Sequence, residues 1–152
     1  MKRHMVSVML LLAAVVLALT PRVAAAAEER PFAATFSPQS VTPDGKYYVY
    51  DVAGTASHAG NFSAVANNHF SRGGTRLVGF MVITAQNGDE LWIEYEQTLE
   101  ITTAAGTWTG TYTITGGTGR FAEASGQGDA IVVIPTEPPG PVIGTFEGTI
   151  NF

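Results

Sequence analysis

Cysteine is absent from all 152 residues of the chain. A disulfide framework and a thiol mechanism are therefore both excluded. The fold must be held together by side-chain packing and by main-chain hydrogen bonds alone.

Basic residues are scarce, and three of the eight lie within the first 22 positions. The thirteen acidic residues all follow position 27, so without residues 1–26 the net charge is 5 − 13 = −8. The five remaining cations are Arg30, Lys46, Arg72, Arg76 and Arg120. They form no cluster in the sequence, and an acidic surface repels phosphate backbones. We therefore expect no nucleic-acid partner.

A long apolar run is also missing, because Met5 to Leu19 is shorter than the ~20 residues that a membrane-spanning helix needs. The run follows a basic start at residues 2–4 and precedes small residues at 23–27. This three-part pattern is typical of a secretory signal peptide. We interpret residues 1–26 as a signal peptide, with an uncleaved anchor as the alternative. The protein is then secreted or periplasmic, with no membrane span after signal removal.

In the rest of the chain, apolar and polar residues often alternate with a period of two. Between Thr107 and Thr115, threonines occupy one side, and Trp108, Gly110, Tyr112 and Ile114 occupy the other. Side chains of a strand point alternately to its two faces, so this stretch predicts a half-buried β-strand. Glu90 to Ile101 alternates in the same way, with one face made of Leu91, Ile93, Tyr95, Leu99 and Ile101 and the other rich in glutamate.

Six further strands are expected, at Pro31–Ser37, Lys46–Val52, Phe62–Ala66, Leu77–Thr84, Asp129–Ile134 and Val142–Phe152. Pro43-Asp44-Gly45 and Asn87-Gly88-Asp89 are turn sequences. We expect a bend or bulge within Ala53–Gly60, a loop at Asn67-Asn68, and a connection at Pro135–Pro141. Turn signals every ~8–12 residues without helical periodicity are typical of all-β folds. Residues 31–152 are therefore expected to form a single antiparallel eight-stranded β-barrel, with a two-sheet sandwich as the alternative.

A glycine-rich segment follows the most regular strand. Gly116, Gly117 and Gly119 interrupt the strand, Phe121 follows, and Gly126 leaves room for close packing. A phosphate-binding loop is the functional alternative, but such loops lead into a helix that is absent from this pattern. We interpret the segment as a structural motif in which Phe121 plugs one end of the barrel.

Four motifs stand in one order along the chain: residues 54–62 (GTASHAGNF), 84–91 (TAQNGDEL), 113–121 (TITGGTGRF) and 144–150 (GTFEGTI). Together they resemble bacterial secreted proteins of the allene oxide cyclase/dirigent barrel-like group. The GGTGRF element is the most specific part, and the resemblance covers most of the chain after about Phe32. It implies an eight-stranded antiparallel barrel with a central cavity, often assembled as a homo-oligomer. It implies no activity, and no catalytic residue transfers at matching positions.

His58, Asp89, Glu90 and Arg120 are the catalytic candidates, because their side chains can exchange protons or stabilise charge. A structural role is the alternative for each of them. No metal site or cofactor is expected, since the two histidines after residue 26 lack a recognisable third ligand. The glutamate row of residues 90–100 is interpreted as a solvated face, with weak calcium binding as the alternative. Trp92 on that row suggests an oligomer contact or a ligand surface.

The apolar strands at Leu77–Thr84 and Ala130–Ile134 favour a barrel that binds a small apolar ligand, since barrels of ~8 strands hold one small molecule or are filled by side chains. A cyclase- or isomerase-like enzyme is the alternative by resemblance, so whether the protein is an enzyme stays open. A small outer-membrane barrel is a third hypothesis, prompted by the terminal Phe152 and the amphipathic last strand.

Overall fold

The computed structural model describes residues 27–136 and 140–152. The predicted signal peptide and residues 137–139 of the proline-rich connection lie outside this range. The strands are β1 (Arg30–Asp44), β2 (Tyr47–Ala56), β3 (Gly60–Ser71), β4 (Arg76–Ala85), β5 (Glu90–Ile101), β6 (Ala105–Gly117), β7 (Ser125–Pro135) and β8 (Ile143–Asn151). Two single-turn 3₁₀ helices join them, η1 (Arg72–Gly74) and η2 (Gly119–Phe121).

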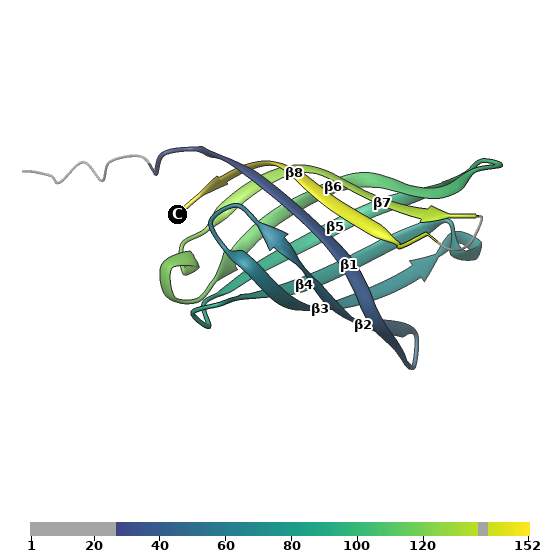
Figure 1. The fold of residues 1–152 in the computed structure, drawn as a ribbon, viewed down its shortest axis with the longest axis horizontal. Helices are drawn as coiled ribbons and strands as arrows, with labels where there is room; N and C mark the ends of the chain where they lie inside the picture. Colours follow the sequence, from purple (N-terminus) through teal and green to yellow (C-terminus); the bar gives the residue numbers. More distant parts are fainter. Residues whose placement is uncertain (1–26, 137–139) are drawn as a thin grey trace, which may run out of the picture.

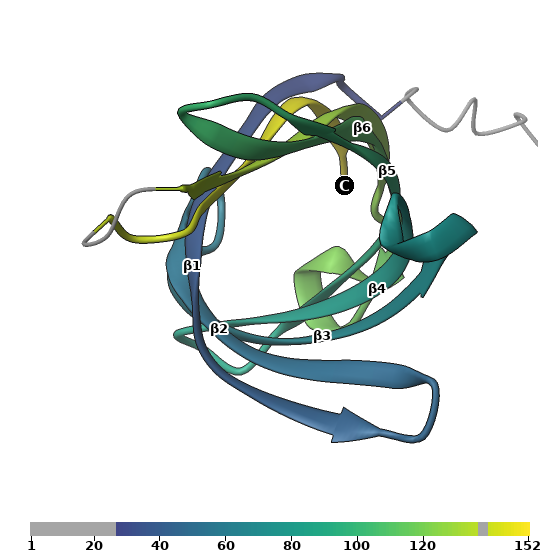
Figure 2. The ribbon, with the colours of Figure 1, turned by 90° about the vertical axis from the view of Figure 1, so that its right-hand side faces the viewer.

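The eight strands form one closed antiparallel barrel in chain order (Figure 1). Each strand pairs with the next, and the ring closes where β1 pairs with β8, from Arg30 opposite Ile150 to Phe36 opposite Gly144. Figure 2 looks along the barrel and shows the ring of strands around a central space. This confirms the predicted barrel and excludes the two-sheet sandwich. Within the described residues, none of the helices has the length and apolar character required to cross a bilayer.

Three expectations about local structure were wrong or too short. Asn67 and Asn68 do not form a loop, because they lie within β3 and pair with Phe80 and Gly79 of β4. The strand expected to end at Val52 continues to Ala56 as β2, and the bend expected within Ala53–Gly60 is the turn at residues 57–59. The first strand extends to Asp44, with a register irregularity between Pro38 and Ser40. Asparagine and small residues have low β-propensity, but pairing on both sides overrides that preference inside a closed sheet.

Alternation places the apolar side chains inside the barrel and the polar side chains outside. On β6, Trp108, Tyr112 and Ile114 are buried, as predicted, while Thr111 and Thr113 are exposed. On β5, Leu91, Ile93 and Tyr95 are buried. The pattern therefore fixes the register of the sheet, since a one-residue slip would turn these rings to solvent.

One end of the barrel is filled. Phe121, carried by η2, is fully buried, and its ring lies 5.2 Å from that of Phe152. Phe32 and Leu91 are buried at the same end. Figure 2 shows η2 behind the ring of strands, at the far end from the viewer. The aromatic ring of Phe121 thus closes this end, which is the place that the sequence motif predicts for it.

Glycines allow the large rings to lie flat against the inner wall. Gly128 of β7 and Gly148 of β8 are opposite each other, and Tyr112 is opposite Gly128 on the other side. The Tyr112 hydroxyl oxygen lies 2.8 Å from the position that a Cβ on Gly148 would take, and the carbonyl oxygen of Gln127 lies closer still. A side chain at residue 148 would therefore displace either the tyrosine or the neighbouring strand.

We predict that Gly148→Ala lowers the free energy of unfolding by about 1–3 kcal/mol, the usual cost of overpacking a tight interior. Gly106→Ala is the matched control, because a Cβ there would meet only Leu99 Cδ1 at an ordinary 3.6 Å. Urea denaturation of both variants and the wild type measures the difference. Equal stabilities of the two variants would contradict the assigned close approach.

Candidate functional site

The other end of the barrel is hollow. A cavity of about 650 Å³ lies within it, lined by residues of all eight strands. The lining runs from Phe36 on β1 to Phe146 on β8, and it reaches Ile101 at the end of β5, which is 74% exposed. The cavity therefore opens at the end that carries the β5–β6 turn and η1, which faces the viewer in Figure 2.

Phe146 forms the floor of the cavity. Its ring packs against Phe36 at 4.9 Å, Tyr112 at 5.0 Å and Tyr95 at 5.8 Å between ring centroids. Tyr112 lies below this layer and does not line the cavity. Such tilted contacts are favourable for aromatic pairs and hold the rings in defined positions. The layer separates the hollow half of the barrel from the half filled by Phe121.

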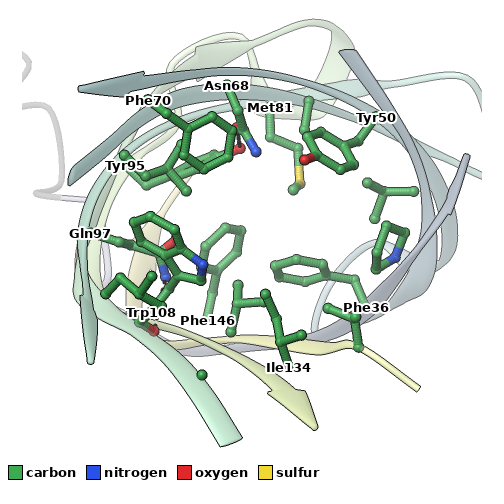
Figure 3. Close-up of a pocket in the computed structure, with 18 of the residues that line it drawn as sticks. Phe36, Tyr50, Asn68, Phe70, Met81, Tyr95, Gln97, Trp108, Ile134 and Phe146 are labelled. Atoms are coloured by element: carbon green, nitrogen blue, oxygen red, sulfur yellow. Dashed lines mark hydrogen bonds between the residues drawn. The ribbon is translucent and has the colours of Figure 1, made fainter. Parts of the chain in front are cut away.

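The walls are mostly aliphatic and aromatic (Figure 3). They comprise Tyr50, Val52, Ala66, Phe70, Leu77, Met81, Leu99, Trp108, Val132 and Ile134. None of the lining residues in the described part of the chain is Asp, Glu, Lys, Arg or His. The described part of the cavity wall is therefore mainly apolar and carries no charged group.

Two polar side chains meet on the wall formed by β3 and β5. The Tyr95 hydroxyl donates a hydrogen bond of 2.5 Å to Asn68 Oδ1. Burial raises the pKa of Tyr95 well above its ordinary value, although the Asn68 contact opposes the shift. Tyr95 therefore stays a neutral hydrogen-bond donor at any ordinary pH, and it does not act as a base.

Gln97, two positions after Tyr95 on β5, is a further polar wall residue. Its side chain is only 2% exposed, and apart from tyrosine and tryptophan it is the one buried polar residue in the described part of the chain. The Nε2 group donates to the carbonyl oxygen of Ala130 at 3.0 Å and lies 3.4 Å from that of Trp108. Gln97 is thus tied to β6 and β7 while it faces the cavity.

The catalytic candidates predicted from the sequence do not line the cavity. His58 sits in the β2–β3 turn with a positive φ of 66°, and its Nε2 donates to the Pro31 carbonyl at 3.0 Å. Its ring also packs against Phe152. These contacts are the structural hydrogen bond that the sequence offered as the alternative role for this histidine.

Asp89, Glu90 and Arg120 meet at the filled end instead. An Asp89 carboxylate oxygen lies 3.8 Å from Arg120 Nε and accepts from the Arg120 backbone N–H at 3.3 Å. Glu90 accepts a 3.0 Å hydrogen bond from the Trp92 indole N–H. Asp89 therefore braces the β4–β5 turn against the glycine-rich segment through Arg120, and the Glu90 backbone pairs with Thr118 of the same segment, on the far side of Phe146 from the cavity. Trp92 finds its cover within the chain, from Glu90 and from the adjacent Gly116.

The glycine-rich motif has a structural explanation at each position. Gly116, with φ 145°, lies at the bulge where Trp92 is opposite Gly116 but Ile93 is opposite Ile114. Gly119 has φ 56°, and a Cβ there would collide with the Asp89 carboxylate. At Gly117 a Cβ would lie 2.8 Å from Phe121 Cβ, and at Gly126 it would meet the Thr149 carbonyl. The motif lets η2 fold back over the barrel end.

Gln97 and Asn68 are site residues that the sequence analysis did not identify. The signal for Gln97 was present, because it occupies the inward position between Tyr95 and Leu99 in the alternating pattern. Asn68 was hidden by its placement in a predicted loop. In the part of the chain that the structure covers, no three His, Cys, Asp or Glu side chains converge as metal ligands would.

The inward tyrosines predict how stability depends on pH. Burial raises the pKa of Tyr95, and burial together with the charge of Asp129 raises that of Tyr112 to about 12. The unfolded chain loses these protons first, at about pH 10, so the stability is fully present below that pH and is lost as the pH rises above it. Tyr95→Phe should make this loss shallower than in the wild type. Urea denaturation between about pH 8 and 11 measures how steeply the free energy of unfolding falls with pH in the wild type and in Tyr95→Phe. Equal slopes would contradict the raised pKa of Tyr95.

Comparisons with known proteins leave the function to be argued from this geometry. No family model, no curated protein and no solved structure matches the chain. The resemblance to the allene oxide cyclase/dirigent group therefore stays a prediction from sequence motifs. The closed barrel, its filled end and its hollow end are the observations on which a functional proposal must stand.

Proposed function

We propose that this protein is a secreted or periplasmic barrel that binds a small, mainly apolar molecule in its open end. The observation that carries the proposal is the cavity of about 650 Å³ above Phe146. Ligand cavities of proteins usually measure about 300–1,000 Å³, with apolar walls and a few placed polar groups. The hollow half of this barrel has that size and that composition.

The contrast between the two ends supports binding over simple incomplete packing. The same strands bury Phe121, Ile83 and Ile150 completely at the filled end. At the open end, Tyr50, Phe70 and Trp108 line the space without filling it. Apolar walls without partner atoms forfeit dispersion contacts, and a ligand of matching character restores them. The location outside the cytoplasm rests on the predicted signal peptide.

The cyclase or isomerase alternative has less support from this geometry. Acid–base catalysis needs a positioned group whose pKa lies near the working pH. The ionisable groups on the described cavity wall are tyrosines, and burial raises the pKa of both Tyr50 and Tyr95. His58, Asp89, Glu90 and Arg120 lie outside the cavity. The groups that line the described cavity wall therefore fit ligand binding better than acid–base catalysis.

The outer-membrane alternative requires the opposite distribution of side chains. Such barrels carry an apolar band outside and polar groups inside. Here the buried interior holds Phe, Tyr, Ile and Leu side chains, while the threonines of β6 and the glutamates of β5 point outward. Assembly of the barrel into a homo-oligomer stays a prediction of the family resemblance.

Binding of N-phenyl-1-naphthylamine, an uncharged apolar dye that fluoresces in apolar surroundings, tests the proposal. At about 0.3 kcal/mol per non-hydrogen atom, its 17 such atoms give a binding free energy of about −5 kcal/mol, which is a Kd of about 0.2 mM. We predict that Ala66→Phe weakens dye binding at least about tenfold, because Ala66 is buried in the cavity wall and a phenyl ring there occupies the ligand volume.

Val65→Phe is the matched control. It introduces the same ring one residue earlier on β3, where the side chain is 43% exposed on the outer face. Dye binding by this variant should equal that of the wild type. Circular dichroism and thermal melting establish that both variants fold. Equal dye affinity of folded Ala66→Phe and the wild type would overturn the proposed binding site.

A further inference from the structure

The orientation of the Gln97 amide shows which of its two polar atoms has no hydrogen-bond partner in the cavity wall. Its Nε2 faces two carbonyl oxygens, those of Ala130 and Trp108. Only the NH₂ end of an amide can donate to a carbonyl, so these contacts fix which end of the side chain is which. The carbonyl end, Oε1, is therefore the end left for the cavity.

Gln97 Oε1 receives no hydrogen bond from any described residue. Among the described residues, the fully buried side-chain atoms without a partner are those of Tyr112 and Asn151, so Gln97 Oε1 keeps contact with the open space of the cavity that Gln97 lines. A polar atom placed in this way on an apolar wall can accept a hydrogen bond from a ligand. The Asn68 amide adds a complementary group, because its oxygen is used by Tyr95 and its NH₂ end has no acceptor among the described residues. The described cavity wall thus presents one free acceptor on β5 and one free donor on β3, the two strands that flank β4.

Two more polar atoms face the same space. Figure 3 shows the indole nitrogen of Trp108 and the hydroxyl of Tyr50 turned toward the centre of the cavity. Neither has a hydrogen-bond partner within the described part of the chain. All four groups are neutral, and each sits on an otherwise apolar wall. A ligand that matched them would carry a small number of uncharged polar atoms on an apolar body.

A charged ligand is disfavoured by the same wall. An ion that loses its water needs a counter-charge or several strong hydrogen bonds, and otherwise its burial costs several kcal/mol. The described lining holds no cationic and no anionic side chain. Arg76, which starts β4 at the open end, is paired with Glu96 on the outer surface and does not line the cavity.

We propose that the cavity selects an uncharged ligand whose apolar body carries a hydroxyl or another hydrogen-bond donor, placed against Gln97 Oε1. The inference rests on the proposed function, since it specifies the ligand of the same cavity. The Asn68 NH₂ group, the Trp108 indole N–H and the Tyr50 hydroxyl then bind an ether, carbonyl or hydroxyl oxygen elsewhere on the ligand. Fatty-acid carboxylates and protonated alkyl amines are disfavoured by their charge.

Displacement of N-phenyl-1-naphthylamine by three probes that share an unbranched ten-carbon chain tests this selection. 1-Decanol has a donor, methyl decanoate has only acceptors, and decanoate carries a charge at neutral pH. We expect decanol to bind at least about tenfold more tightly than decanoate, because decanol forms one buried hydrogen bond and avoids the burial of a charge. Decanoate binding as tightly as decanol to the wild type would overturn the inference.

Gln97→Met separates the contribution of the Gln97 hydrogen bond to ligand affinity from that of the cavity shape. Methionine has a similar length but offers only a weak hydrogen-bond acceptor. This variant should lose most of the affinity for decanol, by about five- to tenfold, while its affinity for methyl decanoate stays unchanged. Equal losses for both probes would assign Gln97 a merely structural role and contradict the proposal. If Gln97→Met does not fold, the comparison of the three probes on the wild type decides alone.

The outcomes also separate this inference from the proposed function. If the dye fails to bind, or if Ala66→Phe does not weaken its binding, the cavity is not a binding site and both proposals fall. If the dye binds in the cavity but alcohol and carboxylate displace it equally, only the selection for an uncharged donor is wrong.

Discussion

The packing of Phe146 against Phe36, Tyr95 and Tyr112 divides the interior of this barrel. A closed sheet of eight strands has an interior that is just wide enough for side chains to fill or for one small molecule to occupy. In this barrel, side chains fill one end, and the other end contains a cavity. Below the Phe146 layer the side chains pack to exclude solvent, and above it they line a cavity.

That division depends on glycines as much as on aromatic rings. Gly128 and Gly148 give Tyr112 a flat wall, and the Phe36 ring occupies the space that a side chain on Gly144 would need. On the inner wall, the rings of Tyr112 and Phe36 thus lie next to glycines, whose missing side chains leave room for them. Each ring is contacted by a glycine on one side and by Phe146 on another. The same rigid layer that stabilises the filled end supplies the floor of the binding cavity, so stability and function share one set of contacts.

The sequence predicts the barrel well because alternation is a local property. Trp108, Tyr112 and Ile114 are buried where a period of two puts them, and Phe121 closes a barrel end as its glycine-rich setting indicates. Asn68 could not be placed, because its low β-propensity suggested a loop, while pairing with both neighbouring strands keeps it within β3. Long-range pairing decides such positions, and a single sequence does not display it.

The candidate functional residues also differ in how well the sequence predicts their roles. His58, Asp89, Glu90 and Arg120 are the residues with the most obvious catalytic chemistry, yet His58, Asp89 and Arg120 brace turns at the filled end and the Glu90 side chain holds Trp92. Gln97 is chemically unremarkable, and only its inward position on an apolar face gives it a role. For a barrel of this kind the more informative sequence signal is a polar residue at an inward position, rather than an ionisable residue near a turn.

Methyl NMR during titration with N-phenyl-1-naphthylamine tests the central claim most directly, namely that the open end is the binding site. The account predicts shifts for the methyl groups of Leu77, Met81 and Leu99, which line the cavity. Those of Leu91 and Ile150, buried below the Phe146 layer, should not move. Shifts confined to the filled end, or to the outward-facing Val65 and Val78, would contradict the account.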